Sequence, residues 1–360
     1  ARDAIRSLRQ EGKAPADETA VNIMGGDYQL KRGFQLGKQD GGSPGRPVTY
    51  QAYEGQDVRL QGGTILSDFK RVQTPELLKR LPEQSRDHVL QCNLQAHGIT
   101  DFGRFRPRGF SRSSAPAHLE LFYDHRRMEV ARWPSTEYAR IDGPGELNSE
   151  GDDHGGEVGK LESGFFFYDK RPSKWLNLDN VWIHGYWAWD WADSFEHIAS
   201  YDPGSGHIKT HPPFGLYGFR EGQRFYFLNI LEELDQPGEY FVDQESGLLF
   251  FWPPGPVEGV EIAASVIEEP LIQIERTNHL QIQGLVLEYG RGDGLLSEDG
   301  SGLSVTGCAF GNLGNNGIVM SGGKGNTIQS CDIHHTGDGG IRLSGGNRKT
   351  LEGSEHVATN

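Results

Sequence analysis

The C-terminal third of the chain repeats a pattern every 23 residues. Ile282 is followed at this interval by Val305 and then by Ile328. The same offset relates three further sets of positions, namely Leu287, Phe310 and Ile333; Gly294, Gly317 and Gly340; and Tyr289, Asn312 and His335. A unit of short strands and turns of this length cannot enclose a core alone, so it must stack on copies of itself.

This period predicts a parallel β-helix, in which each coil lies about 4.8 Å from the next and alternate residues point inward. Leu285 follows Ile282 by three residues rather than two, which predicts a bend near 283–284. After Leu343 the strand pattern returns near Val357. That delay predicts a surface turn about six residues longer than those of the other coils.

The N-terminal segment has the features of a cap and of the first coils. Residues 2–12 place Ile5 and Leu8 among polar neighbours and end at Gly12, which predicts a short amphipathic helix. Short strand-like runs follow up to residue 60, separated by Gly-rich turns. We expect the cap and first coils in 1–63 and the repeating coils in 257–360. Because a stack ending at Asn360 would leave strand edges unpaired, we expect further coils beyond it.

Residues 64–256 have longer and more aromatic strand-like runs, one of them Leu178–Trp191. A hairpin is nearly explicit where Tyr240–Val242 and Leu248–Trp252 flank the turn DQESG. These runs predict an inserted antiparallel β-sandwich domain. The predicted fold class is therefore all-β: a parallel β-helix with this insertion and a short N-terminal capping helix.

Composition excludes several classes of function. The 50 glycines and 10% aromatic residues fit a folded chain with many tight turns rather than a disordered one. A net charge of −15 disfavours nucleic acid and anionic membranes as partners, because both carry negative charge. The three cysteines, Cys92, Cys308 and Cys331, have no metal-ligand spacing, and His334 and His335 lack spaced partners. We therefore predict neither a metal nor another cofactor.

Segments along nearly the whole chain carry a family resemblance. They are ARDAIRSLRQ, GGDYQL, SPGRPVTYQAYEGQDVRLQGG, LELFYDHRRMEVARWPS, WIHGYWAWDWADS, LNILEELDQPGEYFVDQESGLLFFWPP and the Gly-rich coils after 270. Together the chain resembles bacterial right-handed parallel β-helix glycoside hydrolases with an inserted β-sandwich, the pectin-lyase-like relatives of β-xylosidase, lacto-N-biosidase and fucosidase/xylanase type. The resemblance implies a right-handed helix, a glycan substrate and catalytic carboxylates on later coils.

Glycoside hydrolysis needs two carboxylates, which neighbouring coils of a β-helix hold at suitable spacings. Asp338 stacks on Asn315 and Asp332 on Ala309, and from these phases we predict no in-phase pair of acids in the coils up to Asn360. We take Asp338, His335 and Asp332 as candidate catalytic residues, with a partner from a later coil or the inserted domain. The alternative is that Asp338 and His335 are turn residues on the surface and that Asp332 is a solvated acid.

Candidate substrate-binding residues lie in two places. Trp187, Trp189 and Trp191 alternate in sequence, so in a strand they would share one face and could stack on sugar rings. The alternative is that they pack at a domain interface. Arg342 points outward between Ile341 and Leu343, and its images Val319 and Leu296 build no cationic groove.

The sequence thus predicts a carbohydrate-active β-helix enzyme, foremost a glycoside hydrolase, of which residues 1–360 lack the full catalytic pair. Two alternatives stay open: a lyase acting on an acidic polysaccharide, and a non-catalytic carbohydrate-binding β-helix module. The expected partner is an oligo- or polysaccharide, with no nucleic acid and no membrane. We expect a secreted or periplasmic protein that is a monomer or a weak homo-oligomer.

Overall fold

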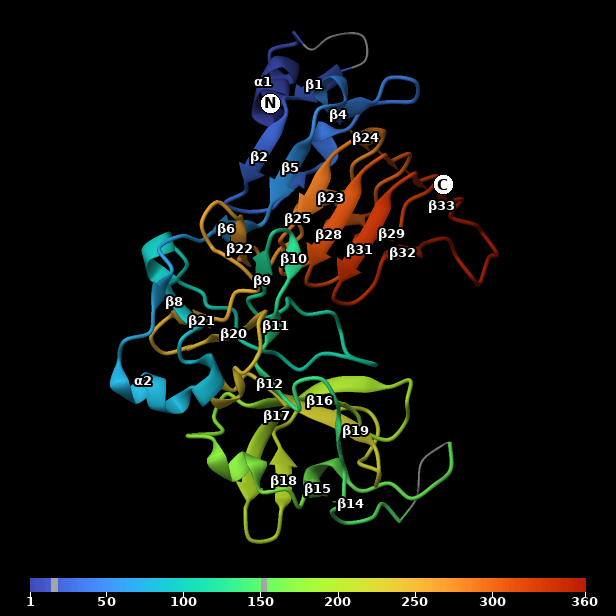
Figure 1. Ribbon diagram of the computed structural model, residues 1–360. Helices are drawn as coiled ribbons and strands as arrows, with labels where there is room; N and C mark the ends of the chain where they lie inside the picture. The colour runs from blue at the N-terminus through green and yellow to red at the C-terminus, as the bar shows by residue number, and fades with distance from the viewer. Residues whose placement is uncertain (14–18, 150–153) are drawn as a thin grey trace. The chain divides into compact units, whose positions relative to one another are not determined.

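The computed structural model describes residues 1–13, 19–149 and 154–360, and the chain divides into two compact units (Figure 1). The first unit comprises Ala1–Ile65, Pro116–Glu120 and Ala263–Asn360. The second comprises Leu66–Ala115 and Leu121–Ile262.

Three parallel sheets build the first unit. Sheet 1 runs β1 (Thr19–Ile23), β4 (Val48–Ala52), β24 (Leu280–Gln283), β27 (Ser304–Thr306), β30 (Thr327–Gln329) and β33 (Val357–Thr359). Sheet 2 runs β2 (Gly26–Gln29), β5 (Val58–Gln61), β25 (Val286–Glu288), β28 (Ala309–Leu313) and β31 (Asp332–Thr336). Sheet 3 runs β3 (Phe34–Leu36), β23 (Ile272–Glu275), β26 (Leu295–Glu298), β29 (Ile318–Ser321) and β32 (Ile341–Ser344). Figure 1 shows β5, β25, β28 and β31 side by side as successive coils.

The register confirms the 23-residue period. Ile282 pairs in parallel with Val305, and Val305 with Ile328. The predicted bend near 283–284 is also confirmed, since Gly284 has φ 66° and its image Ser330 has φ 49°, both in the left-handed region that turns the chain. The delayed coil returns at Val357, which pairs with Thr327, 30 residues earlier.

The core of the β-helix consists of the inward residues of all three sheets. Leu287 and Phe310 are fully buried on neighbouring coils, and Cys308 lies buried beside them as a free thiol. Burying each of these large side chains contributes about 1.5–3 kcal/mol relative to leaving it in water. The stack of inward apolar rows is therefore what holds the coils together.

The predicted N-terminal helix is α1 (Arg2–Gln10), followed by Gly12 with φ 68°. Arg6 anchors it, since its Nε and Nη2 donate to both carboxylate oxygens of Asp40 at 2.7 and 2.6 Å. A second helix, α2 (Pro75–Arg80), was not expected from the sequence; Pro75 fits its first turn because proline lacks only an N–H that has no partner there. Neither helix is long and apolar enough to cross a membrane, and no other helix in the described ranges is.

The second unit is mainly antiparallel. An eight-stranded sheet contains β12 (Arg132–Trp133), β19 (Arg224–Leu228), β16 (Trp182–Tyr186), β17 (Asp193–Asp202), β18 (His207–Thr210), β15 (Phe165–Phe166) and β14 (Gly143–Pro144), with β13 (Ala139–Arg140) on β19. A five-stranded sheet contains β11 (Glu129–Val130), β20 (Glu239–Val242), β21 (Leu248–Phe251), β8 (Leu90–Asn93) and β7 (Lys70–Arg71). β9 (Leu121–Tyr123) and β10 (Arg126–Arg127) form a hairpin. β6 (Gly63–Ile65) pairs antiparallel with β22 (Ile262–Ser265), which lies far from it in the sequence.

The predicted hairpin is present, because β20 pairs antiparallel with β21 across the DQESG turn. The predicted strand Leu178–Trp191 is shorter, since β16 ends at Tyr186 and residues 187–191 form the connection to β17. The all-β fold class, with its parallel β-helix, antiparallel part and short N-terminal helix, is confirmed.

Candidate functional site

The predicted catalytic residues lie on sheet 2 and in the turn after it. Asp332 and His335 belong to β31, and Asp338 follows in the turn. All three are exposed, whereas Ile333 points inward and packs against the core. The Asp338 N–H donates to the Asn315 carbonyl at 3.2 Å, which is the stacking expected from the period.

His335 and its neighbour His334 interact directly. Their Nδ1 atoms lie 2.8 Å apart, so one ring donates to the other. His335 has φ 50°, and its images Asn312 and Tyr289 have φ 53° and 62°. All three lie in the left-handed region and turn the chain at the end of a sheet-2 strand. The structure thus brings His335 next to His334, and the catalytic role predicted for His335, Asp332 and Asp338 remains a prediction.

A column of mainly polar residues crosses the successive strands of sheet 2, at positions that point away from the core of the β-helix. Gln61, Glu288, Gly311 and His334 are register partners on successive coils. Glu288 is only 4% exposed, and it accepts hydrogen bonds from Gln61 Nε2 at 3.1 Å and from Arg59 Nη1 at 3.2 Å. The His334 ring occupies the space where a side chain at Gly311 would begin. Glycine at 311 therefore lets the histidine ring fold back over the sheet.

Sheet 3 carries a pair of acids that the sequence analysis missed. Glu275 and Glu298 are register partners on the adjacent strands β23 and β26, and both point outward into solvent. Their backbones are therefore about 4.8 Å apart. The prediction that these coils hold no in-phase acid pair is wrong, because 275 and 298 differ by the repeat length itself. Arg276 lies beside the pair, with its Nη2 3.8 Å from Glu275 Oε1.

A cavity of about 350 Å³ opens on sheet 3 next to Glu275. Its polar lining comes from Arg2, Arg6, Arg32, Gln35, Gln273 and Glu275. Arg2 Nη1 donates to the Gln35 carbonyl at 2.8 Å, so the cap helix holds that guanidinium in place. Arg32 has no ion pair within the part of the chain that the structure describes. One carboxylate of the pair thus faces a cavity rich in hydrogen-bond donors.

The electrostatics of this cavity depend on the Arg6–Asp40 pair. Burial acts to raise the pKa of Asp40, but the Arg6 guanidinium and the Gly37 N–H outweigh it and hold the pKa below its ordinary value. Asp40 therefore stays ionised and neutralises Arg6. Arg2 is also paired, since its Nη2 lies 2.8 Å from Asp3 Oδ1, so the positive charge left to the cavity comes mainly from Arg32.

The tryptophans do not form the flat row expected of a strand. Trp187 is 2% exposed and its Nε1 donates to Ser194 Oγ at 2.9 Å, so it offers no surface to a substrate; this corrects its prediction as a binding residue. Trp191 is 48% exposed and contacts Tyr217 with ring centroids 5.2 Å apart. Trp189 is half-buried under Arg220, whose guanidinium carbon lies 5.0 Å from the ring centroid. The three rings diverge because residues 187–191 are a turn.

Arg342 lies outward on β32 and is exposed. Its register partner on β29 is Val319, which in turn pairs with Leu296 on β26. The column beneath Arg342 is therefore apolar, as expected, and its predicted substrate contact stays a prediction.

Comparisons with known proteins agree with this architecture. Residues 270–356 match the family described as right handed beta helix region. A search of curated proteins finds no match. A solved structure named glycoside hydrolase aligns with a TM-score of 0.59 and 12% identity, covering 93% of this chain and 69% of that one. A structure of XylC in complex with xylose aligns with 11% identity over 88% of this chain and 48% of that one, at a TM-score of 0.35, too low to support an argument. Residues 270–356 therefore form a right-handed parallel β-helix, and the chain as a whole has a fold like that of a solved glycoside hydrolase.

Proposed function

We propose that this protein is a carbohydrate-active enzyme, a glycoside hydrolase that cleaves its glycan on the outer surface of the β-helix. The observation that carries the proposal is the in-register pair Glu275 and Glu298 on neighbouring coils. The fold adds support, since a solved glycoside hydrolase shares it over 93% of this chain.

The pair fits the chemistry of glycosidic cleavage. Retaining hydrolases hold two carboxyl groups about 5–5.5 Å apart, one as nucleophile and the other as general acid and base. In-register partners on adjacent coils start about 4.8 Å apart at the backbone, so Glu275 and Glu298 fit that spacing. In this proposal one of the two attacks the anomeric carbon and forms a glycosyl-enzyme bond while the other protonates the leaving oxygen. The second carboxylate then removes a proton from a water molecule, which displaces the first carboxylate from the anomeric carbon, so the sugar is released with its configuration retained.

The residues around Glu275 supply binding groups. Gln273 and Gln35 line the cavity with side-chain amides, which both donate and accept hydrogen bonds as sugar hydroxyls require. Arg2 and Arg32 add charged donors. A sugar ring seated there would place its glycosidic bond beside the carboxylates.

Asp332, His335 and Asp338 form the second candidate catalytic set, and Trp189, Trp191 and Arg342 remain proposed substrate contacts. We further propose that the protein acts in the periplasm or outside the cell as a monomer or weak homo-oligomer, because the glycans on which such enzymes act lie there.

One observation favours a second function, a lyase acting on an acidic polysaccharide. Three arginines line the cavity beside Glu275, and of these Arg32 has no ion pair among the described residues, whereas Arg2 and Arg6 are paired with Asp3 and Asp40. In a lyase, cationic side chains lower the pKa of the proton next to a uronate carboxylate so that a base can remove it. The charge of the bound sugar separates the two functions.

The test is a turnover assay on the full-length protein. Aryl glycosides and neutral oligosaccharides report hydrolysis as released sugar, and polyuronates report the lyase as the ultraviolet absorbance of an unsaturated product. We expect released sugar, and a loss of about 10²–10⁴-fold in kcat for Glu275→Gln and Glu298→Gln, since each removes an acid–base or nucleophilic group without changing shape.

Two comparisons sharpen the result. Asp27→Asn, on the exposed strand β2, is the matched control and should keep full activity. If Asp332→Asn or Asp338→Asn abolishes turnover while both glutamate variants remain active, the chemistry belongs to the second candidate set. Glycan binding without any turnover would identify a non-catalytic module.

A further inference from the structure

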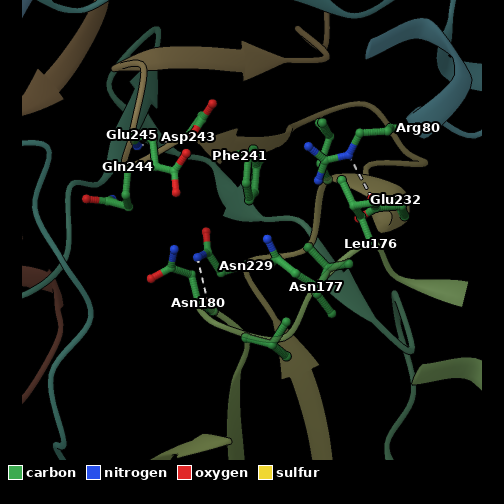
Figure 2. Close-up of a pocket in the computed structure, with 13 residues that line it drawn as sticks. Arg80, Leu176, Asn177, Asn180, Asn229, Glu232, Phe241, Asp243, Gln244 and Glu245 are labelled. Atoms are coloured by element: carbon green, nitrogen blue, oxygen red, sulfur yellow. Dashed lines mark hydrogen bonds and ion pairs between the residues drawn. The ribbon is translucent and has the colours of Figure 1, made fainter. Parts of the chain in front are cut away.

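A cavity of about 190 Å³ lies within the second unit, and the functions above make no use of it (Figure 2). Three separate stretches meet around it: the residues 176–181 before β16, the residues 229–232 after β19, and the residues 241–245 at the turn from β20 to β21. The part of the chain that builds this cavity is therefore fixed by strand pairing, since β16 pairs with β19 and β20 with β21.

Side-chain amides and carboxylates converge on this cavity. Figure 2 shows Asn177, Asn229 and Asp243 arranged around the ring of Phe241. The Asn177 side chain is exposed and makes no hydrogen bond to any residue that the structure describes, so its amide is available to a ligand. Amides both donate and accept, carboxylates accept, and an aromatic ring offers an apolar surface. A sugar ring presents the matching groups, namely hydroxyls along its edge and C–H bonds on its faces.

The lining is preorganised rather than loose. Asn229 is 6% exposed, adopts φ 67°, and donates from Nδ2 to the Asn180 carbonyl at 2.8 Å and from its backbone N–H to Ala131 at 2.9 Å. The Asp243 carboxylate accepts from the Glu245 N–H at 3.0 Å. Gln244 Nε2 donates to the Phe102 carbonyl at 3.1 Å. Groups already held in position lose little entropy when a ligand binds.

The charged side chains that line this cavity disfavour an anionic ligand. Arg80 is the cation on the lining, and its Nε donates to Glu232 Oε1 at 2.8 Å, so its charge is neutralised (Figure 2). Asp243 and Glu245 add two further carboxylates to the lining. An acidic sugar would be repelled by these groups, whereas a neutral sugar would be hydrogen-bonded by them.

We propose that this cavity binds one neutral sugar unit of a glycan, at a site formed by residues other than the proposed catalytic ones. Its volume, below the roughly 300–1,000 Å³ of sites for drug-sized ligands, suits a single ring rather than a stretch of chain. Asn177 and Asn229 contact the ring hydroxyls, Asp243 accepts from them, and Phe241 packs against the C–H surface.

The test is a titration of the full-length protein with xylose, glucose and galactose as neutral probes and galacturonate as the anionic one, followed by calorimetry and ligand-detected NMR. We expect saturable binding of at least one neutral sugar and weaker binding of galacturonate. Asn177→Ala should weaken the neutral component about fivefold, the loss of one hydrogen bond. Phe241→Leu, which keeps an apolar side chain in place, should weaken it by a similar factor.

Matched controls come from the same unit. Gln84→Ala and Tyr168→Ala change exposed side chains that do not line the cavity and should leave the affinity within about twofold, as surface changes usually do. The proposal is overturned if no neutral sugar binds, if neither Asn177→Ala nor Phe241→Leu reduces any component of binding, or if galacturonate binds as tightly. Turnover measured on the same variants should be unchanged with a short aryl glycoside, so the failure of this site and the failure of the proposed hydrolysis are seen separately.

Discussion

Replacing Gly294 by alanine should push two coils of the β-helix apart. A Cβ at this position would lie 2.6 Å from Phe310 Cδ1, 2.7 Å from the Gly317 carbonyl oxygen and 2.8 Å from Leu313 Cδ1. All three atoms belong to the coil that stacks on Gly294, whose own N–H donates to the Asn316 carbonyl at 2.9 Å.

The loss of stability follows from how closely atoms surround Gly294. Carbon atoms pack best at about 3.5–4.0 Å, so the new methyl group requires a displacement of several tenths of an ångström at three contacts. Phe310 is fully buried and cannot swing away, and Gly317 presents backbone. Overpacking of this kind costs about 1–3 kcal/mol. Gly37→Ala is the control, because no atom lies within 4 Å of its Cβ position and its φ of −117° suits alanine.

Native-state hydrogen exchange measures this locally, which matters because a chain with two units need not unfold in one step. We expect amides of β26 and β29 to exchange about 5- to 150-fold faster in Gly294→Ala, the factor corresponding to 1–3 kcal/mol. Adding Phe310→Leu should recover part of the loss, since the two changes meet at one contact. If Gly294→Ala is as harmless as Gly37→Ala, the coils do not stack in this register.

Three further predictions concern titratable groups. Burial raises the pKa of Glu239 to about 8, above its unfolded value near 4.5. Its contribution to stability is therefore full below about pH 4.5 and is lost as pH rises toward 8. In Glu239→Gln the midpoint of denaturation should depend less on pH across that range. Arg6→Ala leaves Asp40 buried without its cation and should cost about 3 kcal/mol in urea unfolding at pH 7, with Arg6→Ala/Asp40→Asn recovering part of it. The neighbouring Cys308 thiol lowers the pKa of Cys331, whereas burial raises the pKa of Cys92 to about 11. Cys331 should therefore react before Cys92 with a thiol reagent at pH 8, and faster labelling of Cys92 would contradict this.

The β-helix was predictable because the sequence repeats with the length of one coil. Inward residues such as Leu287 and Phe310 recur at one phase, and the turn positions that adopt positive φ, such as Gly284 and Gly307, recur at another. The Glu275–Glu298 pair follows from the same offset, because the two acids lie 23 residues apart in the sequence and one coil apart in the structure.

The conformation of the tryptophan segment and the cavity of the second unit depend on contacts between residues far apart in the sequence. Alternation in the segment around Trp189 predicted a strand, but β16 ends at Tyr186 because the chain turns there to pair with β17. The sugar-sized cavity joins Asn177, Asn229 and Phe241 from stretches that lie far apart in sequence. No local pattern marks them: the pairing of β16 with β19 brings the stretches of Asn177 and Asn229 together, and Phe241 comes from β20 in a different sheet.

The most direct test of the account is a cross-link between the two coils that carry the proposed carboxylates. Glu275→Cys/Glu298→Cys should form a disulfide on mild oxidation, identified by peptide mapping that separates it from Cys92, Cys308 and Cys331, because in-register neighbours lie within the Cα distance that a disulfide spans. Glu275→Cys/Ser321→Cys, two coils apart at about 9.6 Å, should not. A bond in the second variant, or none in the first, would contradict the placing of Glu275 beside Glu298 and with it the proposed chemistry.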